Sequence, residues 1–593
     1  PMEGADLELQ LQEAVKHIRG SMVAAVDIEA ELDEMPESIL IEFGVHKGDK
    51  VGIYLPKGSN QIVAVLAILG IGACYVPIGV NQALQRMRGM LLKANIKTII
   101  SDENGKKYLQ ENVQQNIVLV NAKNAVKSSC DTMPDSTERS AYIIFTSGTT
   151  GEPKGVEISH RSAWNTINEV NKICCVDEHS KILSVSALEF DLSVYDIFGI
   201  LSEGGTVVVT SENARRDAAV WANAIMDYNI TVWNSVPYLL NMLLTVAETE
   251  GKVFPSLKKV ILSGDWIGLD LPERLKRIAP NAEMLAMGGA TEAAIWSNFI
   301  QVQLPLPSKW VSIPYGKPLA GQLYRVVDQA GKDCPNWVSG ELWIGGDGVA
   351  KGYISDDLLT EEKFVYENGI RWYKTGDMGR FWPDGTIEFL GRKDTQVKIR
   401  GHRIEMGEIE SILNQYPGII SSVVDVVGIK ESKKIYAYII SRQKKLDFKS
   451  IEQFLKSYLP EYMIPSKFVM GEKIPLSLNG KVERSYVSRI LEENLNVESV
   501  DYEEPIGTTE TTISLIWKKV LKIEKLSRND DFFEVGGDSL KAVSIMSQLK
   551  QKNLVPINTS VQILFTNSTI KKFAEQVNRL NMEENQETEI DTI

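Results

Sequence analysis

The sequence contains the segment YIIFTSGTTGEPKG at residues 142–155, from which the prediction of the fold starts. Its first four residues are apolar and rich in β-formers, which predicts a buried strand. In the ten that follow, glycines and hydroxyls let the backbone close on a polyphosphate, and Lys154 adds positive charge. A Walker A loop would end in Gly-Lys-Ser/Thr, whereas this loop ends in Pro153-Lys154-Gly155. We therefore expect a strand and a phosphate-binding loop of another type, with a flexible turn as the alternative.

Short apolar runs alternate with longer amphipathic stretches on both sides of this segment. Besides 141–145, strands are expected at Val51–Leu55, Lys97–Ser101, Ile117–Val120, Lys181–Ser184, Thr206–Thr210 and Lys259–Leu262. This alternation is typical of a layered α/β fold. From about Gly340 to residue 390, short strands with glycine turns follow. The acidic stretch Val23–Glu42 has a helical pattern as far as Pro36.

Residues 61–85 carry no charge and are largely apolar. A membrane-spanning helix needs about 20 apolar residues, but Gly70, Gly72 and Pro77 interrupt this stretch. We expect a buried helix over Ser59–Leu69 and a buried strand over Ala73–Pro77 instead, and no membrane association.

The composition is that of a globular protein. The chain has 593 residues, 44% of them hydrophobic and 24% charged, and this length predicts about four structural units. The net charge of −14 argues against a broad nucleic-acid-binding surface. Five cysteines without a C-x₂-C pair indicate neither a disulfide framework nor a zinc site. The acidic start has no apolar signal sequence, so we expect a cytoplasmic protein.

Further short strings follow the phosphate loop in a fixed order. They are Phe190–Asp196 (FDLSVYD), Gly288–Glu292 (GGATE), Gly340–Leu342 (GEL), Tyr373–Asp377 (YKTGD), Gly391–Asp394 (GRKD), Gln396–Gly401 (QVKIRG) and Asn479–Lys481 (NGK). The set resembles the signature of adenylate-forming enzymes, which include acyl-CoA synthetases, luciferases and the adenylation domains of nonribosomal peptide synthetases. The resemblance covers about residues 48–490 and implies a large α/β subdomain, a small α+β subdomain, and the use of ATP and Mg²⁺.

The resemblance also implies roles for individual residues. The ATP-binding residues would be Thr146, Ser147, Gly148, Thr149, Thr150, Gly151, Lys154, Gly289, Asp377 and Arg392. The carboxylate of Asp377 would accept hydrogen bonds from the ribose hydroxyls. Glu292 would hold Mg²⁺, an ion that prefers oxygen ligands, and Thr291 would lie near the α-phosphate.

Two further roles concern the charge that develops during adenylation and the movement of the smaller subdomain. Lys481 would bridge the substrate carboxylate and the α-phosphate, stabilising the charge that develops during adenylation. Asp394 would be the hinge about which the smaller subdomain rotates between adenylation and thioester formation. A tight turn between strands is the alternative at this position.

A second strong pattern is Asp530–Leu540 (DDFFEVGGDSL). It resembles the phosphopantetheine attachment site of a peptidyl carrier domain, with Ser539 as the attachment residue. Leu540, Val543 and Met546 recur at helical spacing, which predicts a helix after Ser539. A helix N-cap is the alternative role for Ser539 alone. The resemblance implies a four-helix bundle whose 4′-phosphopantetheine thiolate, rather than a cysteine of this chain, receives the activated acid.

Together these patterns divide the chain. The expected parts are the large subdomain (1–391), hinge (392–394), small subdomain (395–491), linker (492–507), carrier domain (508–580) and an acidic tail (581–593). The linker is acid-rich, contains Pro505 and has no hydrophobic period. We expect the tail to be frayed because it is terminal and acidic.

The resemblance extends to the substrate pocket. Asp191 would pair with the α-ammonium of an amino acid, which is worth about 1.5–3 kcal/mol, and activators of fatty or aryl acids usually lack it. The other pocket positions would be Leu192, Tyr195, Asn234, Ile261, Ser263, Met287, Ile295 and Trp296. This set is similar to that of cysteine-activating domains, with bulky Tyr195 and Trp296 shortening the pocket. Serine and alanine stay open, because a pocket discriminates one small group by only about 1–3 kcal/mol.

Three classes of function are compatible with these patterns. The first is a ligase, part of a nonribosomal peptide synthetase module that adenylates an amino acid and loads it on its own carrier. The second, an acyl- or aryl-CoA ligase relative, is disfavoured by Asp191 and Ser539. The third, a non-catalytic docking module, is disfavoured because four residues needed for catalysis are intact: Lys154, Glu292, Asp377 and Lys481. The first implies as partners a phosphopantetheinyl transferase, neighbouring condensation or cyclisation domains, and as a further candidate a small MbtH-like protein.

Overall fold

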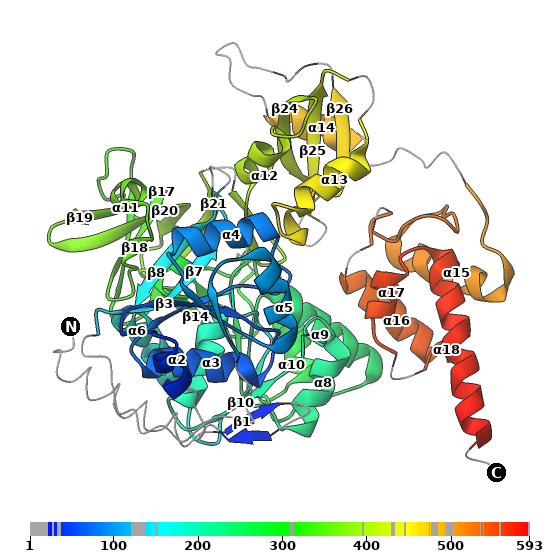
Figure 1. Cartoon of the computed structure of the whole chain (residues 1–593), viewed down its shortest axis with the longest axis horizontal. Coiled ribbons are helices and arrows are strands. Elements are labelled where there is room, and N and C mark those ends of the chain that lie inside the picture. Colours follow the sequence, from blue (N-terminus) through cyan, green and yellow to red (C-terminus); the bar gives the residue numbers. More distant parts are fainter. Residues whose placement is uncertain are drawn as a thin grey trace.

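The protein is described by a computed structural model with a large α/β part, a small α/β part and a helical part (Figure 1). The structure describes residues 22–25, 29–31, 37–119, 137–148, 152–393 (except 213, 309 and 311), 396–428, 433–443, 446–471, 473, 475, 484–493, 502–533, 535–537, 539–556 and 559–590. This architecture confirms the predicted fold class, a layered α/β protein followed by a helical bundle.

A nine-stranded sheet forms one half of the large part, in the order β15-β14-β13-β12-β11-β9-β10-β1-β2. Neighbouring strands from β13 to β1 pair in parallel, and the outer strands pair antiparallel. Its strands are β1 (Met22–Ala25), β2 (Glu29–Glu31), β9 (Lys181–Ser184), β10 (Thr206–Val209), β11 (Val232–Ser235), β12 (Lys259–Leu262), β13 (Glu283–Gly288), β14 (Asn298–Val302) and β15 (Lys317–Pro318).

A seven-stranded sheet forms the other half, in the order β18-β8-β7-β4-β3-β5-β6. Its strands are β3 (Lys50–Tyr54), β4 (Cys74–Pro77), β5 (Thr98–Ser101), β6 (Asn116–Leu119), β7 (Ser140–Thr146), β8 (Lys154–Ser159) and β18 (Gly352–Tyr353). The phosphate-loop segment joins β7 to β8, which pair antiparallel with Thr146 opposite Lys154. The strand predicted before the loop is therefore confirmed.

Helices cover these sheets. They are α2 (Glu37–Glu42), α3 (Ser59–Gly70), α4 (Leu84–Lys93), α5 (Glu103–Asn112), α6 (His160–Cys174), α7 (Leu192–Val194), α8 (Ala218–Asp227), α9 (Pro237–Glu250), α10 (Leu271–Ile278) and α11 (Asp357–Lys363), with the short turns η2 (Tyr195–Gly199) and η3 (Thr291–Ala293). The uncharged stretch forms the predicted buried helix α3 and strand β4, because its apolar residues lie in the core. No helix among the described residues is long and apolar enough to cross a membrane.

A five-stranded antiparallel sheet completes the large part and leads to the small one. It contains β16 (Gln322–Val327), β17 (Gly340–Gly346), β19 (Phe364–Glu367), β20 (Ile370–Phe381) and β21 (Ile387–Arg392). The small part follows with β22 (Gln396–Ile399), β23 (His402–Glu405), α12 (Met406–Leu413), β24 (Ile419–Val427), β25 (Lys434–Ser441), α13 (Phe448–Lys456), η5 (Glu461–Met463), β26 (Lys467–Gly471) and α14 (Arg484–Glu493).

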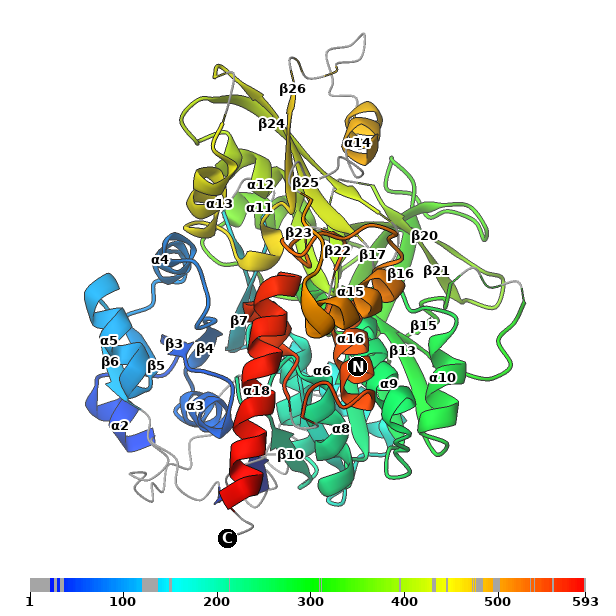
Figure 2. The ribbon, with the colours of Figure 1, turned by 90° about the vertical axis from the view of Figure 1, so that its right-hand side faces the viewer.

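The helical part contains α15 (Gly507–Leu521), α16 (Ser539–Gln551), α17 (Gln562–Thr566) and α18 (Ile570–Ile590). Trp517, Phe532 and Phe573 are fully buried between them. Figure 2 shows α16 beside α8 and α9 of the large part, so the helical part rests on the nine-stranded-sheet half.

Two expectations differ from the structure. The helical pattern predicted before Pro36 is wrong, since β1 and β2 lie there; β1 pairs with β10. A pairing between strands so far apart in sequence overrides local propensity. The prediction of a frayed tail is wrong as far as Ile590, because helix α18 continues to that residue. Extending an existing helix costs far less than starting one, and Glu and Gln are good helix formers.

Candidate functional site

A cavity lies where the large part meets the β22–β23 hairpin. From the large part it is lined by the predicted residues Asp191, Leu192, Ser263, Gly289, Thr291, Ile295, Trp296, Asp377 and Arg392. The small part contributes Gln396, Lys398, Gly401 and Arg403. The structure therefore brings predicted substrate and nucleotide residues from distant segments into one cavity.

The Asp191 carboxyl group is buried at this cavity, at the start of α7. Burial raises its pKa to about 6, although a hydrogen bond from Thr291 and the charge of Lys398 act in the opposite direction. The Thr291 hydroxyl donates to Asp191 Oδ2 over 2.7 Å. A buried carboxylate that accepts from the Thr291 hydroxyl and the Leu192 N–H still has acceptor capacity for a cation such as an ammonium group.

The walls beside Asp191 are held by polar contacts. Trp296 Nε1 donates to Ser263 Oγ over 2.8 Å, and the Tyr195 ring packs edge-on against Trp296 with centroids 5.1 Å apart. Asn234 Nδ2 donates to the Leu192 carbonyl over 3.2 Å and to Asp196 Oδ1 over 2.7 Å. The indole and hydroxyl that line the cavity therefore have fixed orientations.

Three predicted pocket residues lie behind these walls. Tyr195, Asn234 and Ile261 are completely buried. None of them lines this cavity or its neighbour, which contains the predicted residue Met287 in its wall. The structure places all three in the layer that supports the pocket.

The neighbouring cavity shares Gly289, Asp377 and Arg392 with the first. The β20–β21 pairing sets Asp377 opposite Arg392, and Arg392 Nη1 lies 2.5 Å from Asp377 Oδ1. Burial raises the pKa of Asp377, while Arg392 lowers it. Tyr315 lines this second cavity and stacks on Phe389, with centroids 5.1 Å apart. An acidic acceptor near an aromatic wall fits a nucleoside.

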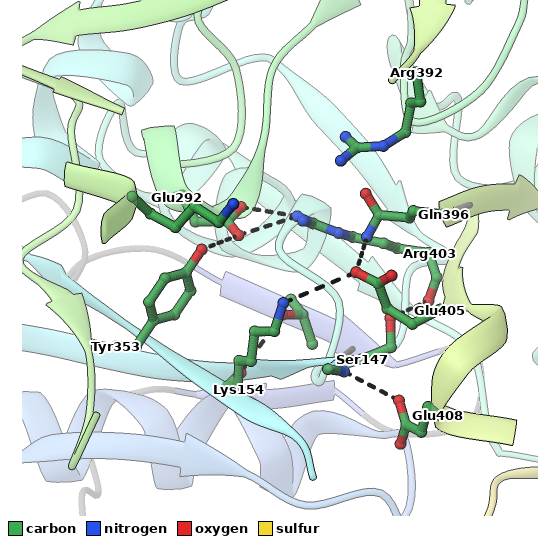
Figure 3. A network of polar contacts seen from close by, with 12 residues as sticks. Ser147, Lys154, Glu292, Tyr353, Arg392, Gln396, Arg403, Glu405 and Glu408 are labelled. Atoms are coloured by element: carbon green, nitrogen blue, oxygen red, sulfur yellow. Dashed lines mark hydrogen bonds and ion pairs between the residues drawn. The ribbon is translucent and has the colours of Figure 1, made fainter. Parts of the chain in front are cut away.

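The phosphate loop contacts the small part (Figure 3). Ser147 Oγ donates to the Arg403 carbonyl over 2.8 Å, and the Gly148 N–H donates to Glu408 Oε2 over 3.1 Å. Lys154 Nζ lies 3.9 Å from Glu405 Oε1. In this arrangement, groups that suit a polyphosphate instead face the β23–α12 segment.

Glu292, the predicted metal ligand, is completely buried in the same network (Figure 3). Arg403 Nη1 lies 2.9 Å from Oε2 and 3.1 Å from Oε1, and the Tyr353 hydroxyl donates to Oε1 over 2.9 Å. Burial by itself would raise the pKa of Glu292, but Arg403 and neighbouring donors hold it at about 2.

These contacts leave Glu292 unsuited to a metal ion in this arrangement, because both carboxylate oxygens already face donors. Among the described residues, no group of three or more His, Cys, Asp or Glu side chains could hold a metal. A Mg²⁺ ion at Glu292 would require Arg403 to leave.

Five predicted site residues lie outside the described residues: Thr149, Thr150, Gly151, Asp394 and Lys481. Two others lie at the ends of elements. Ser539 is the first residue of α16. Thr146 is the last residue of β7.

Arg403, Glu405 and Glu408 were not predicted as site residues. They directly follow the string Gln396–Gly401, within IRGHRIEMGEIE at residues 399–410. The alternation of charged and apolar residues there is a signal of a two-sided hairpin, although it does not specify which side chains reach Glu292.

Comparison with known families agrees with the two sets of motifs. Residues 33–354 match the family described as AMP-binding enzyme, which is more than half of the chain. The chain belongs to the AMP-binding enzyme family. Residues 511–577 of this AMP-binding enzyme match the family described as phosphopantetheine attachment site. ATP and 4′-phosphopantetheine are thus its expected cofactors, with Mg²⁺ as is usual in the family.

Individual relatives of this AMP-binding enzyme carry both parts. It is 43% identical over 561 residues to the anguibactin system regulator of Vibrio anguillarum. The aligned region covers 93% of this chain and 53% of the relative. The chain thus spans about half the length of that relative, and only 10% of bacitracin synthase 1 of Bacillus licheniformis.

Solved structures show the same fold. One is holo-AB3403, a four-domain nonribosomal peptide synthetase bound to AMP and glycine, with TM-score 0.59, 28% identity, and coverage of 96% of this chain and 42% of that chain. Another is holo-PA1221, a nonribosomal peptide synthetase protein with adenylation and carrier domains, with TM-score 0.78, 22% identity and 96% coverage of both chains. The AMP-binding enzyme is therefore an adenylate-forming ligase of the nonribosomal peptide synthetase type, joined to a carrier.

Proposed function

We propose that the protein activates L-cysteine as its aminoacyl adenylate and loads it as a thioester on the phosphopantetheine of its own carrier at Ser539. The subdomain boundaries proposed are those expected from the sequence, with α18 extending past residue 580. Serine, and after it alanine, are the alternative substrates.

The observation that supports this proposal is the shared cavity. Asp191, an acceptor for an α-ammonium group, lines the same cavity as Asp377 and Arg392, which suit a ribose. An amino acid held by Asp191 would thus lie beside a bound nucleotide. Its carboxylate would attack the α-phosphorus and pyrophosphate would leave, with Thr291 nearby and Lys481 stabilising the developing charge.

The choice of cysteine rests on the size and polarity of the pocket. Trp296, braced by Tyr195, closes the side-chain end, and Ser263 already accepts the Trp296 N–H. A short side chain fits this space, and the wall between Ile295 and Leu192 is apolar. A thiol is less costly to bury there than a hydroxyl, because it is a weaker hydrogen-bonding group.

The arrangement described supports the thioester-forming half of the reaction. Arg403 pairs with the Glu292 carboxylate, and the β23–α12 segment contacts the phosphate loop. Binding of ATP and Mg²⁺ would therefore have to break these contacts. Meanwhile α16, which begins at Ser539, rests against α9. We infer that adenylation uses a second placement of the small subdomain, reached by rotation at residues 392–394.

Amino-acid-dependent ATP–pyrophosphate exchange tests the proposal, with the standard amino acids and representative aryl and fatty acids as substrates. We expect the fastest exchange with cysteine, followed by serine and alanine. Exchange with another amino acid alone would contradict the cysteine assignment, and exchange only with aryl or fatty acids would contradict the role of Asp191. The Ser539→Ala variant is the matched control: it should keep exchange and lose all carrier loading.

A further inference from the structure

We propose that Tyr238 is a positioning residue for carrier loading. Its hydroxyl binds the start of carrier helix α16, and its ring contacts the β22–β23 turn. The inference rests on the proposed function, because it concerns the transfer step that follows adenylation. It assigns one side chain to the junction of the large part, the small part and the carrier.

The first contact is with the carrier. Tyr238 is the second residue of α9, is 8% exposed, and its hydroxyl oxygen accepts the N–H of Leu540 over 3.1 Å. Leu540 directly follows Ser539, where α16 begins. The first four N–H groups of a helix have no acceptor within it, so an outside oxygen stabilises the helix start as an N-cap does. The Tyr238 hydroxyl therefore fixes the backbone next to the attachment residue.

The second contact is with the small part. The Arg400 guanidinium carbon lies 5.6 Å from the centroid of the Tyr238 ring, which is a cation–π distance. Arg400 Nε is buried, and none of the described residues accepts a hydrogen bond from it. The ring of Tyr238 thus lies against a cation whose buried Nε has no hydrogen-bond acceptor among the described residues.

The turn that carries Arg400 lies close to the base of α9. Gly401 has φ +85°, and a Cβ atom there would lie 2.4 Å from Cγ1 of Val236, two residues before Tyr238. Gly401 also lines the substrate cavity. A continuous path of contacts therefore runs from the cavity through Gly401 and Arg400 to Tyr238 and the start of α16.

Other contacts also join the carrier to the rest of the chain. Lys434 Nζ of the small part donates to the Phe533 carbonyl over 2.7 Å, and two further bonds reach the large part. Gln551 Nε2 donates to the Thr249 carbonyl over 3.0 Å, and Ser560 Oγ donates to Asp217 Oδ2 over 2.9 Å. These bonds hold the far end of α16 and the following loop on α9 and α8. Tyr238, in contrast, makes its two contacts together only when both the small part and the carrier are seated.

This geometry predicts different effects on the two half-reactions. Tyr238 is not among the residues that line either cavity, so adenylation does not require its hydroxyl. Transfer requires the thiol on Ser539 to reach the activated acid, and the hydroxyl places the start of α16. Removing that hydroxyl should slow transfer alone.

The test compares full-length Tyr238→Phe with wild type after conversion of both to the pantetheinylated form with coenzyme A and a phosphopantetheinyl transferase. ATP–pyrophosphate exchange with cysteine reports adenylation, and single-turnover loading of labelled cysteine reports transfer. We expect exchange within about twofold of wild type and loading slowed about 3- to 10-fold, the effect of one lost hydrogen bond. Tyr366→Phe, which removes an exposed hydroxyl on β19, is the control and should change neither rate.

Each outcome decides the inference. Unchanged loading would overturn it, and so would an equal loss of exchange and loading, which would show a structural effect on the large part. An absence of cysteine-dependent exchange in wild type would instead contradict the proposed function.

A second variant tests the ring contact. Arg400→Met should also slow loading more than exchange, because the ring loses its cation. If Arg400 acts through Tyr238, the effect of Arg400→Met on loading should shrink in the Tyr238→Phe background, where no hydroxyl remains to be positioned. Fully additive effects would overturn the coupling between the two contacts.

Discussion

Asp191 shows how a single side chain combines a structural cost with a proposed function. Its carboxyl group is buried, and burial raises its pKa to about 6 despite the hydrogen bond from Thr291. Because folding favours the protonated form, this group contributes most to stability below its unfolded pKa, and that contribution is lost as pH rises through about 6. Binding of an ammonium group has the opposite requirement, since it needs the ionised form.

We therefore predict that kcat/KM for the amino acid in ATP–pyrophosphate exchange falls as pH drops below about 6, by up to about tenfold per unit. Asp191→Asn should lower kcat/KM at pH 8 by about 10- to 100-fold, corresponding to the loss of a charge-assisted hydrogen bond. The variant should also lose the step near pH 6. A step that persists in Asp191→Asn would assign the titration to another group.

Lys57 and Asp196 are buried charged groups behind the pocket, and each acts electrostatically on the other. Lys57 Nζ donates to the Ser186 carbonyl over 2.5 Å, and Asp196 accepts from Asn234. Burial lowers the pKa of Lys57 to about 8 and raises that of Asp196 to about 7, and each charge partly offsets the effect on the other. The pair thus anchors the amide of Asn234 beneath the wall residue Leu192.

Loss of one member should be more harmful than loss of both charges. Lys57→Met leaves the Asp196 carboxylate without that cation, so we expect about 3–5 kcal/mol of destabilisation in urea unfolding. The double variant Lys57→Met/Asp196→Asn should recover much of this loss, because the amide oxygen introduced at position 196 would still accept from Asn234. Equal destabilisation of the single and double variants would contradict the pairing.

At the scale of elements, the π-helical turn η2 shapes the support of the pocket. Turns of this kind are rare and occur often at functional sites. Here η2 begins at Tyr195, whose ring packs on Trp296, and ends at Gly199 beneath the same ring. A Cβ atom on Gly199 would lie 2.6 Å from Cε2 of Tyr195.

We predict that Gly199→Ala raises KM for the amino acid by roughly tenfold, because overpacking typically costs about 1–3 kcal/mol and displaces the ring toward Trp296. KM for ATP should change little. Steady-state exchange kinetics with each substrate varied in turn measure both constants. Gly58→Ala is the control, since a Cβ there meets open space, and an equal rise in KM for ATP would contradict a local effect.

At the scale of the whole molecule, the ion pair between Arg403 on β23 and Glu292 on η3 is one of the contacts that join the small part to the large part. Both side chains are largely buried, so neither charge has much solvent as an alternative partner. The pair joins two parts of the chain, and it also engages the carboxylate of Glu292, the proposed metal ligand.

Arg403→Met should therefore destabilise the described placement more than an alternative one, because an unpaired buried Glu292 costs about 3–5 kcal/mol. We expect carrier loading to fall at least about tenfold more than ATP–pyrophosphate exchange. Both rates on one preparation give the ratio, with Arg380→Met, a surface pair with Glu388, as the control. A common loss of both rates would show that Arg403 serves adenylation as well.

The sequence by itself determined the local elements and their order. Phosphate-loop strand β7, buried helix α3 and the β20–β21 hairpin follow from short-range patterns, since their periodicity and turn residues lie within one segment. The motif strings also indicated most of the cavity lining, because several of them, such as Gly288–Glu292, Tyr373–Asp377 and Gln396–Gly401, contribute residues to its wall.

Only the tertiary structure decided which of these residues meet. Thr291 reaches Asp191 across 100 residues of sequence, Arg403 takes both oxygens of Glu292, and β1 joins β10 against its helical pattern. It also moved Tyr195, Asn234 and Ile261 into the layer behind the pocket and set Leu540 on Tyr238. Such contacts depend on the packing of whole parts, and the free energy that selects them comes from burial shared among distant segments, which no local pattern records.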